Sequence, residues 1–281
     1  MTAASRRRRR FRGHTDVVGD GGASPAPPAP LRLYVHDDLT DDVRERHGAG
    51  SAALAVALEL MALVGRDPGR VTVVTLEEQI ERLLARGPHA PFALAIGIGR
   101  AGERVARQLH ARTGWFPVLE RIGVTREEDG RGGYVLVSTT GAPLSAQLAG
   151  VEAAPSLAVV DDTIFSGLTL RSVLQSLPAA TRARTRAFCL RCVAETLPSI
   201  EALCPVTPGL AAPGRILVEV SFINASGLVR RGAIRRRGRP PLAFFERPEW
   251  IQAWFPGRAD EVIHRCRRLA GLLEADPLPH G

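Results

Sequence analysis

Two adjacent acids at the end of an apolar run are the strongest sign of chemistry in this sequence of 281 residues. Asp161 and Asp162 directly follow the apolar residues Leu157–Val160, and after three spacers come Ser166–Thr169, at the start of a helical pattern. Hydroxyls and free backbone N–H groups at a helix start bind anions such as phosphate. Carboxylates beside an anion site are unfavourable unless the ligand supplies hydroxyls, a metal ion, or both. The segment therefore predicts a site for a sugar phosphate with magnesium.

A glycine-rich turn, Gly97–Gly102, is a second candidate for binding phosphate groups. It ends the apolar run Phe92–Ile98 and precedes a helical pattern at Glu103–Thr113. Its three glycines formally match the dinucleotide-binding pattern, and Glu120 lies near the expected acidic position. Alternatively, Gly99–Gly102 binds a pyrophosphate through backbone N–H groups. Two strand–helix units precede this turn, whereas a dinucleotide-binding domain usually begins with it, so we favour the pyrophosphate interpretation.

The segment Leu157–Thr169 resembles the signature of the type I phosphoribosyltransferases, which use 5-phosphoribosyl 1-pyrophosphate (PRPP). That signature is an apolar strand, two acids, three spacers and then Ser/Thr-Gly-x-Ser/Thr, and every position is filled here. The resemblance implies that Asp161 and Asp162 contact the ribose hydroxyls, while the following loop binds the 5-phosphate. The substrate-binding residues that it implies are Gly99, Ala101, Gly102, Thr163, Ile164, Phe165, Ser166, Gly167, Leu168 and Thr169.

The same resemblance implies a cofactor and a catalytic set. Asp161 and Asp162 would hold Mg²⁺ and would also stabilise the cationic ribosyl centre. All 37 basic residues are arginines, because the sequence contains no lysine, so positive charge for the departing pyrophosphate must come from arginine. Arg100 is the first candidate and completes the catalytic set with the two acids. In the polar segment Ile122–Gly133, the alternatives are Arg126 and Arg131, in an interval where this family often has a mobile loop.

Short apolar runs alternate with helical patterns from residue 31 onwards, which predicts an α/β fold with a parallel sheet flanked by helices. We expect a disordered Arg/Pro-rich tail at 1–30, a phosphoribosyltransferase-like core at 31–204 and a C-terminal hood at 205–281. The expected strands are 31–36, 71–75, 92–98, 116–121, 134–138, 157–160, 187–193 and 216–222. The expected helices are 51–64, 76–86, 103–113, 169–177 and 260–273.

The C-terminal segment carries aromatic residues that could serve the acceptor. In enzymes of this family the segment beyond the core forms a hood that often stacks an aromatic side chain on the acceptor. The candidates are Phe244, Phe245, Trp250 and Trp254, with packing in a hydrophobic core as the alternative for most of them.

A pair of cysteines, Cys189 and Cys192, has the spacing of a metal-binding motif. Residues i and i+3 of a strand point to opposite faces, which makes a chelating pair geometrically poor. We therefore expect buried thiols.

The net charge of +8 is concentrated in two segments. Residues 1–30 contain six arginines and two aspartates, and residues 230–239 contain six arginines and no acid. The rest of the chain is slightly acidic, which argues against a nucleic-acid-binding fold. The sequence has no apolar stretch long enough to cross a membrane. We expect a cytoplasmic protein whose partners are PRPP and a small-molecule acceptor, with a homodimer left open.

These features together favour a pentosyltransferase that moves 5-phosphoribosyl from PRPP to a nitrogen heterocycle or related aromatic acceptor, releasing pyrophosphate. Two alternatives remain at this point. One is a non-catalytic regulator of the same fold that binds PRPP or a nucleotide. The other is a dinucleotide-dependent oxidoreductase built on the glycine turn. No residue is identified as a general base for the acceptor.

Overall fold

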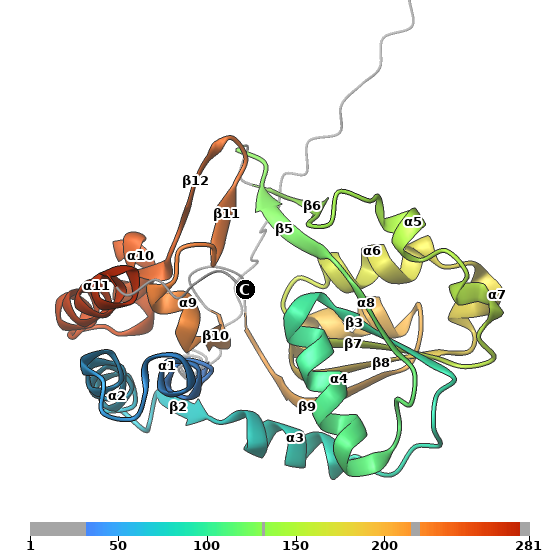
Figure 1. The fold of residues 1–281 in the computed structure, drawn as a ribbon, viewed down its shortest axis with the longest axis horizontal. Coiled ribbons are helices and arrows are strands. Elements are labelled where there is room, and N and C mark those ends of the chain that lie inside the picture. The colour runs from blue at the N-terminus through green and yellow to red at the C-terminus, as the bar shows by residue number, and fades with distance from the viewer. Residues whose placement is uncertain (1–31, 131–132, 215–219, 276–281) are drawn as a thin grey trace, which may run out of the picture. The chain divides into compact units, whose positions relative to one another are not determined.

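Three β-sheets and the helices packed on them make up the described part of the computed structural model, residues 32–130, 133–214 and 220–275 (Figure 1). The predicted tail at 1–30 and Arg131 lie outside these residues. The predicted α/β class, with a parallel sheet flanked by helices, is confirmed. Within the described ranges, no helix is long and apolar enough to span a bilayer.

A five-stranded sheet provides the platform for both sequence motifs. Its strand order is β4-β3-β7-β8-β9, and every pair is parallel. The apolar runs of the sequence form its central strands, because strands that are covered on both faces must be apolar throughout. Its strands are β3 (Leu94–Ile98), β4 (Leu119–Ile122), β7 (Leu157–Ile164), β8 (Thr185–Val193) and β9 (Val206–Ala212).

Helices cover both faces of this sheet (Figure 1). On one face, α3 (Leu76–Leu84) and α4 (Gly99–Thr113) bury residues such as Leu83 and Leu109 against the strands. On the other face, α6 (Leu168–Ser176) and α8 (Leu197–Glu201) do the same. The shorter elements of this region are α5 (Leu144–Gln147), α7 (Ala179–Arg182) and the 3₁₀ turns Val151–Ala153 and Ala194–Thr196.

A second, three-stranded parallel sheet combines the two ends of the described chain. Its order is β10-β1-β2, so a strand from the C-terminal third pairs with the first described strand. The elements of this region are β1 (Leu33–His36), α1 (Thr40–His47), α2 (Ala52–Val64), β2 (Val71–Val74), β10 (Phe222–Asn224), α9 (Ala225–Val229), the 3₁₀ turn Phe244–Glu246, α10 (Pro248–Trp254) and α11 (Ala259–Ala275). The ranges predicted as core, 31–204, and hood, 205–281, therefore each contribute strands to both parallel sheets.

A third sheet is mixed and has the order β12-β11-β5-β6. It joins the hairpin β5 (Val124–Glu128) and β6 (Tyr134–Ser138) to the hairpin β11 (Ile234–Arg236) and β12 (Arg239–Leu242). The polar segment Ile122–Gly133, where this family often has a mobile loop, thus contains the strand β5, which pairs with β6 on one side and with β11 on the other.

Candidate active site

Both sequence motifs line one cavity of about 240 Å³, at the carboxyl ends of β3 and β7. The lining residues are 98–101, 124–126 and 161–170. The structure therefore brings together Gly99, Arg100 and Ala101 with the whole segment Asp161–Thr169. This position, outside the carboxyl ends of parallel strands, is where open α/β sheets bind ligands.

Gly102 is the exception among the predicted binding residues, since it does not line the cavity. A Cβ atom at this position would clash with the carbonyl oxygen of Val160 in β7. Gly97 is similarly restricted, because a Cβ there would lie 2.6 Å from the backbone nitrogen of Glu103. These two glycines let α4 pack closely on the sheet, while Gly99 makes the turn with a φ of 62°.

The dinucleotide interpretation of this turn requires an acidic residue near the turn, and Glu120 does not occupy that position. Glu120 is an exposed residue within β4, where it pairs with Ile96, and it does not line the cavity. The acids that do share the cavity with the glycine turn are Asp161 and Asp162.

The loop after the acidic pair has the geometry of an anion site. Gly167 has a φ of 70°, and a Cβ on it would lie 2.8 Å from the Thr196 side chain. Thr196 also donates a hydrogen bond of 2.5 Å to the Phe165 carbonyl, which fixes the loop. Gly167, the N-cap of α6, has no side chain with which to cap this helix start, and Ser166 Oγ accepts one hydrogen bond of 3.4 Å from the Leu168 N–H. The N–H groups of the next residues of the first turn are available for an anion.

The two acids differ in their surroundings and in the direction of their pKa shifts. Asp161 is 9% exposed, and burial together with the Asp162 charge raises the pKa of its carboxyl well above the ordinary value. Burial also acts to raise the pKa of Asp162, but the nearby charges of Arg191 and His36 outweigh it and lower that pKa. Asp162 Oδ2 accepts hydrogen bonds from Thr163 Oγ1 at 3.0 Å and Arg191 Nη2 at 3.2 Å.

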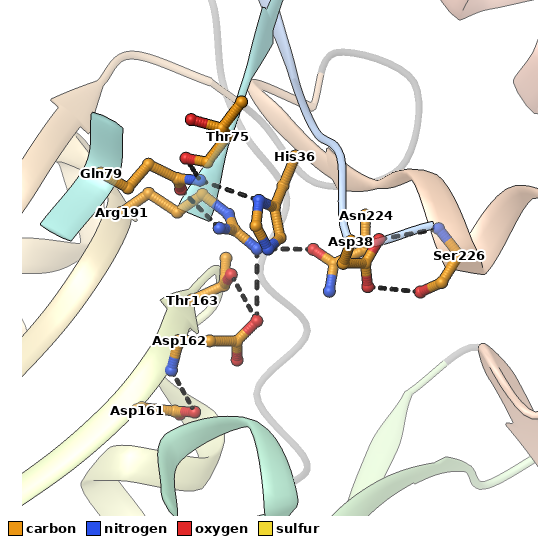
Figure 2. A network of polar contacts seen from close by, with 10 residues as sticks. All are labelled: His36, Asp38, Thr75, Gln79, Asp161, Asp162, Thr163, Arg191, Asn224 and Ser226. Atoms are coloured by element: carbon orange, nitrogen blue, oxygen red, sulfur yellow. Dashed lines mark hydrogen bonds and ion pairs between the residues drawn. The ribbon is translucent and has the colours of Figure 1, made fainter. Parts of the chain in front are cut away.

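Arg191 links Asp162 to elements outside the cavity, as Figure 2 shows. Its guanidinium also donates to Gln79 Oε1 at 2.6 Å and to Asn224 Oδ1 at 2.5 Å. Gln79 Nε2 in turn lies 2.8 Å from His36 Nδ1. Arg191 was not among the residues predicted from the sequence, although an arginine inside the apolar run Ala187–Val193 is a signal that could have identified it.

His36 belongs to the same buried set and is 6% exposed. Burial and the adjacent Arg191 charge lower the pKa of His36 to about 4. Its imidazole is therefore neutral near pH 7, and Nδ1 can accept the hydrogen bond from the Gln79 amide.

Two of the three candidate arginines lie at the cavity. Arg100 is exposed and has no ion-pair partner within the described ranges. The Arg126 guanidinium lies 5.7 Å from the centroid of the Phe165 ring and 5.9 Å from that of Tyr134. Arg126 therefore flanks the cavity from β5, next to an aromatic ring that also lines it.

The four aromatic residues proposed for the acceptor lie elsewhere. Phe245 and Trp254 are buried in the core that packs on the three-stranded sheet, and the partly buried Phe244 and Trp250 pack against that core. Phe244 and Trp254, for example, contact each other edge to face with ring centroids 5.4 Å apart. This confirms the core-packing alternative for these side chains.

The cysteine pair shows one expectation that was wrong and one that is confirmed. Both thiols are buried and free, as expected. They do not, however, lie on opposite faces: Cys189 and Cys192 belong to the same hydrophobic cluster, whereas Leu190 faces the other side of the sheet. A hydrogen bond with Cys192, and burial, raise the pKa of the Cys189 thiol.

No protein-family model matches this sequence, and no curated protein matches it at a significant level. Solved structures that it resembles include a purine phosphoribosyltransferase from Pyrococcus horikoshii, with 17% identity, a TM-score of 0.35, and coverage of 54% of this chain and 89% of that chain. An orotate phosphoribosyltransferase from Aeropyrum pernix has 19% identity, a TM-score of 0.26, and coverage of 60% and 77%. A hypothetical protein from Neisseria gonorrhoeae with bound ppGpp has 13% identity, a TM-score of 0.34, and coverage of 76% and 92%. These TM-scores are low, so function has to be inferred from the residues around the cavity.

Proposed function

We propose that this protein is a PRPP-dependent phosphoribosyltransferase, which transfers 5-phosphoribosyl to a nitrogen heterocycle or related aromatic acceptor and releases pyrophosphate. One observation carries the proposal: the turn Gly99–Ala101 and the segment Asp161–Thr169, which are separated in sequence by β4, β5 and β6, line the same cavity. That cavity combines an acidic pair with two helix starts whose N-cap residues make no side-chain capping hydrogen bond. PRPP has the matching pattern, a ribose with two hydroxyls between a phosphate and a pyrophosphate.

Each part of PRPP has a candidate partner in the cavity. The loop Thr163–Thr169 would bind the 5-phosphate with backbone N–H groups and hydroxyls, as anions bind at helix starts. Asp161 and Asp162 would accept hydrogen bonds from the ribose hydroxyls. The turn Gly99–Ala101 would hold the pyrophosphate, with the Arg100 side chain free to approach it.

Magnesium enters the proposal as an ion that arrives with PRPP. Within the described residues, no group of three or more His, Cys, Asp or Glu could hold a metal ion on its own. Two carboxylates beside a cavity do fit Mg²⁺, which keeps several waters and takes oxygens from a bound phosphate ligand. When bound, magnesium would neutralise charge on the pyrophosphate, with Asp161 and Asp162 as its protein ligands.

The reaction asks for positioning and charge stabilisation more than for proton transfer. The bond between the anomeric carbon and the pyrophosphate oxygen breaks, and a bond to the acceptor nitrogen forms. Positive charge that develops on the ribose would be stabilised by the nearby carboxylates, and negative charge on the leaving group by Arg100 and Arg126. Phe165 offers a ring at the cavity wall for an aromatic acceptor.

Isothermal titration of the full chain with PRPP and MgCl₂ tests the proposal. We expect binding that the double change Asp161→Asn/Asp162→Asn weakens about 100-fold or more, since each carboxylate loses a charge-assisted hydrogen bond. NADPH serves as the comparison ligand and should not bind. Absence of PRPP binding, or equal binding by the double variant, would contradict the proposal.

Release of pyrophosphate over a panel of heterocyclic acceptors then tests catalysis. PRPP binding without pyrophosphate release from any acceptor would favour a regulator of the same fold. A cytoplasmic location and a homodimer stay predictions.

A further inference from the structure

Arg191 is the largest of the fully buried side chains in the described structure, with 0% exposure. Removing a guanidinium from water is unfavourable, and replacing a buried ion pair as a whole by apolar residues of similar volume is often neutral or stabilising. Its Nε also lacks a hydrogen-bond partner among the described residues. Stability alone therefore gives a poor account of an arginine at this position.

The contacts of Arg191 connect three elements with β8. Nη1 donates to Gln79 in α3, while Nη2 donates both to Asn224 in β10 and to Asp162 in β7. Asp162 is the only charged partner of the three and lines the cavity. The neutral side-chain amides of Gln79 and Asn224 thus fix the Arg191 guanidinium, and the guanidinium in turn binds the Asp162 carboxylate.

The amides are themselves fixed by the local fold. Thr75 and Glu78 form a capping box at the start of α3, and Gln79 Nε2 donates to the Thr75 carbonyl at 2.8 Å. Asn224 pairs with His36 in the ladder between β10 and β1. The position of Arg191 is therefore set by the three-stranded sheet as well as by its own strand.

We propose that Arg191 is a positioning residue, which orients the Asp162 carboxylate for the ribose hydroxyls and ties it to the three-stranded sheet. Arg191 does not line the cavity and acts through Asp162. The identity of the ligand rests on the proposed function, whereas the coupling between Arg191 and Asp162 does not. Within the described residues, the polar partners of Arg191 are Gln79, Asn224 and Asp162, and none of them belongs to the glycine turn that would bind pyrophosphate. Loss of the guanidinium should therefore affect ribose recognition selectively.

Titration with separate parts of the substrate tests this selectivity. The probes are ribose 5-phosphate, inorganic pyrophosphate and PRPP, each with MgCl₂, on the full chain. We expect Arg191→Met to weaken ribose 5-phosphate and PRPP about tenfold or more while changing pyrophosphate less than about twofold. Arg186→Met is the matched control, since Arg186 lies on the same strand, is partly buried and donates to Thr207. It should leave all three affinities unchanged.

The conservative change Arg191→Lys serves if the methionine variant does not fold. A lysine ammonium keeps the charge but lacks the planar fork that reaches three partners, so we expect an intermediate loss of ribose 5-phosphate affinity. Equal losses for ribose 5-phosphate and pyrophosphate would indicate a merely structural role and would overturn the inference. Unchanged ribose 5-phosphate affinity in Arg191→Lys and Arg191→Met would also overturn it.

Thermal unfolding decides the coupling even if the wild-type protein binds none of these ligands. In that case the proposed function fails, but Arg191 and Asp162 can still be compared in a double-mutant cycle. We expect Arg191→Met to lower Tm by about 10 °C, because it leaves a carboxylate without its cation, and by less than half as much when Asp162→Asn is already present. Additive shifts in Tm would refute the coupling.

Discussion

The candidate site has two parts that are assembled in different ways. The motif side consists of Gly99–Ala101 and Asp161–Thr169 around the cavity, and the network side consists of the buried polar residues behind Asp162, namely Arg191, Gln79, Asn224 and His36. The turn after β3 and the loop after β7 are each continuous in sequence and take their shape from one strand and the helix that follows. The opposite support of Asp162 comes from Arg191, whose other partners, Gln79 and Asn224, lie 112 and 33 positions away in the chain. A continuous loop carries its pattern in neighbouring residues. A network of residues that are distant in the chain can be recognised only once the order of the strands in the sheets is known.

The difference has an energetic side. On the motif side, the shape of the site is set by backbone geometry, namely glycines at positive φ and close packing of helices on strands. On the network side, buried polar groups satisfy one another, and each of them is costly to leave without its partner. Substitutions on the motif side should therefore lower stability through steric clashes. On the network side they should lower stability by leaving buried polar groups without partners, and they should change how stability depends on pH.

The largest effect on the motif side is expected for Gly102→Val. The added side chain would clash with the Val160 carbonyl and push α4 away from β7, at a cost of about 3 kcal/mol in the free energy of unfolding. Urea unfolding measures this change. Gly271→Ala is the control, because Gly271 is an exposed residue of α11 with open space around its Cα, and helix propensity favours alanine by about 0.5–1 kcal/mol. A Gly102→Val protein as stable as the wild type would show that close helix packing does not shape the turn.

Much of the motif side could be predicted from the sequence. The strand expected at 157–160 and the helix expected at 169–177 correspond to β7 and α6, although β7 continues to Ile164 and so contains the two acids. The glycine turn lines the same cavity as these acids, as the glycine spacing and the paired acids suggested. These are local patterns, so the physical reasons for them lie within a dozen residues. The strand β9 was missed, because Pro208 and Gly209 within it are poor strand formers that tertiary pairing with β8 nevertheless accommodates.

The network side could not be predicted in the same way. The pairing of β1 with β10 joins residues from opposite ends of the chain, and only that pairing brings Asn224 next to Arg191. Nothing in the neighbourhood of Arg191 in the sequence indicates which groups will satisfy its guanidinium. The aromatic residues of the C-terminal segment show the same limit, since their residue types did not distinguish an acceptor site from the core in which Trp254 lies.

The network side should lose stability in acid. The pKa of His36 is lowered from 6.5 to about 4 by burial and by the Arg191 charge, so the folded protein holds a neutral imidazole where the unfolded chain takes up a proton. This contribution to stability is present above pH 6.5 and is lost as the pH falls through about 4, amounting to about 3 kcal/mol over that window. Urea unfolding at a series of pH values from 7 to 4 measures it.

The variant His36→Asn isolates this contribution, since an amide oxygen can still accept from Gln79 but does not titrate in this range. We expect the stability of the variant to fall less steeply with acid than that of the wild type. Parallel curves for the two proteins would show that His36 does not enter the pH dependence, and the network would then be no more sensitive to acid than the motif side.

The smallest predicted effect, about 1 kcal/mol in the free energy of unfolding, comes from replacing one of the two adjacent acids, Asp161 or Asp162, which lie where the motif side and the network side meet. Burial and the Asp162 charge raise the pKa of Asp161, so its contribution to stability is present below the ordinary carboxyl pKa and is lost as the pH rises through the raised value. The lowered pKa of Asp162 has the opposite sign, because Arg191 and His36 outweigh its burial. At pH 8 without metal, Asp161→Asn should therefore raise Tm by a few degrees, and Asp162→Asn should lower it. Changes of the same sign in both variants would mean that the acids share one environment, and that Arg191 does not distinguish the carboxylate it contacts from the one beside it.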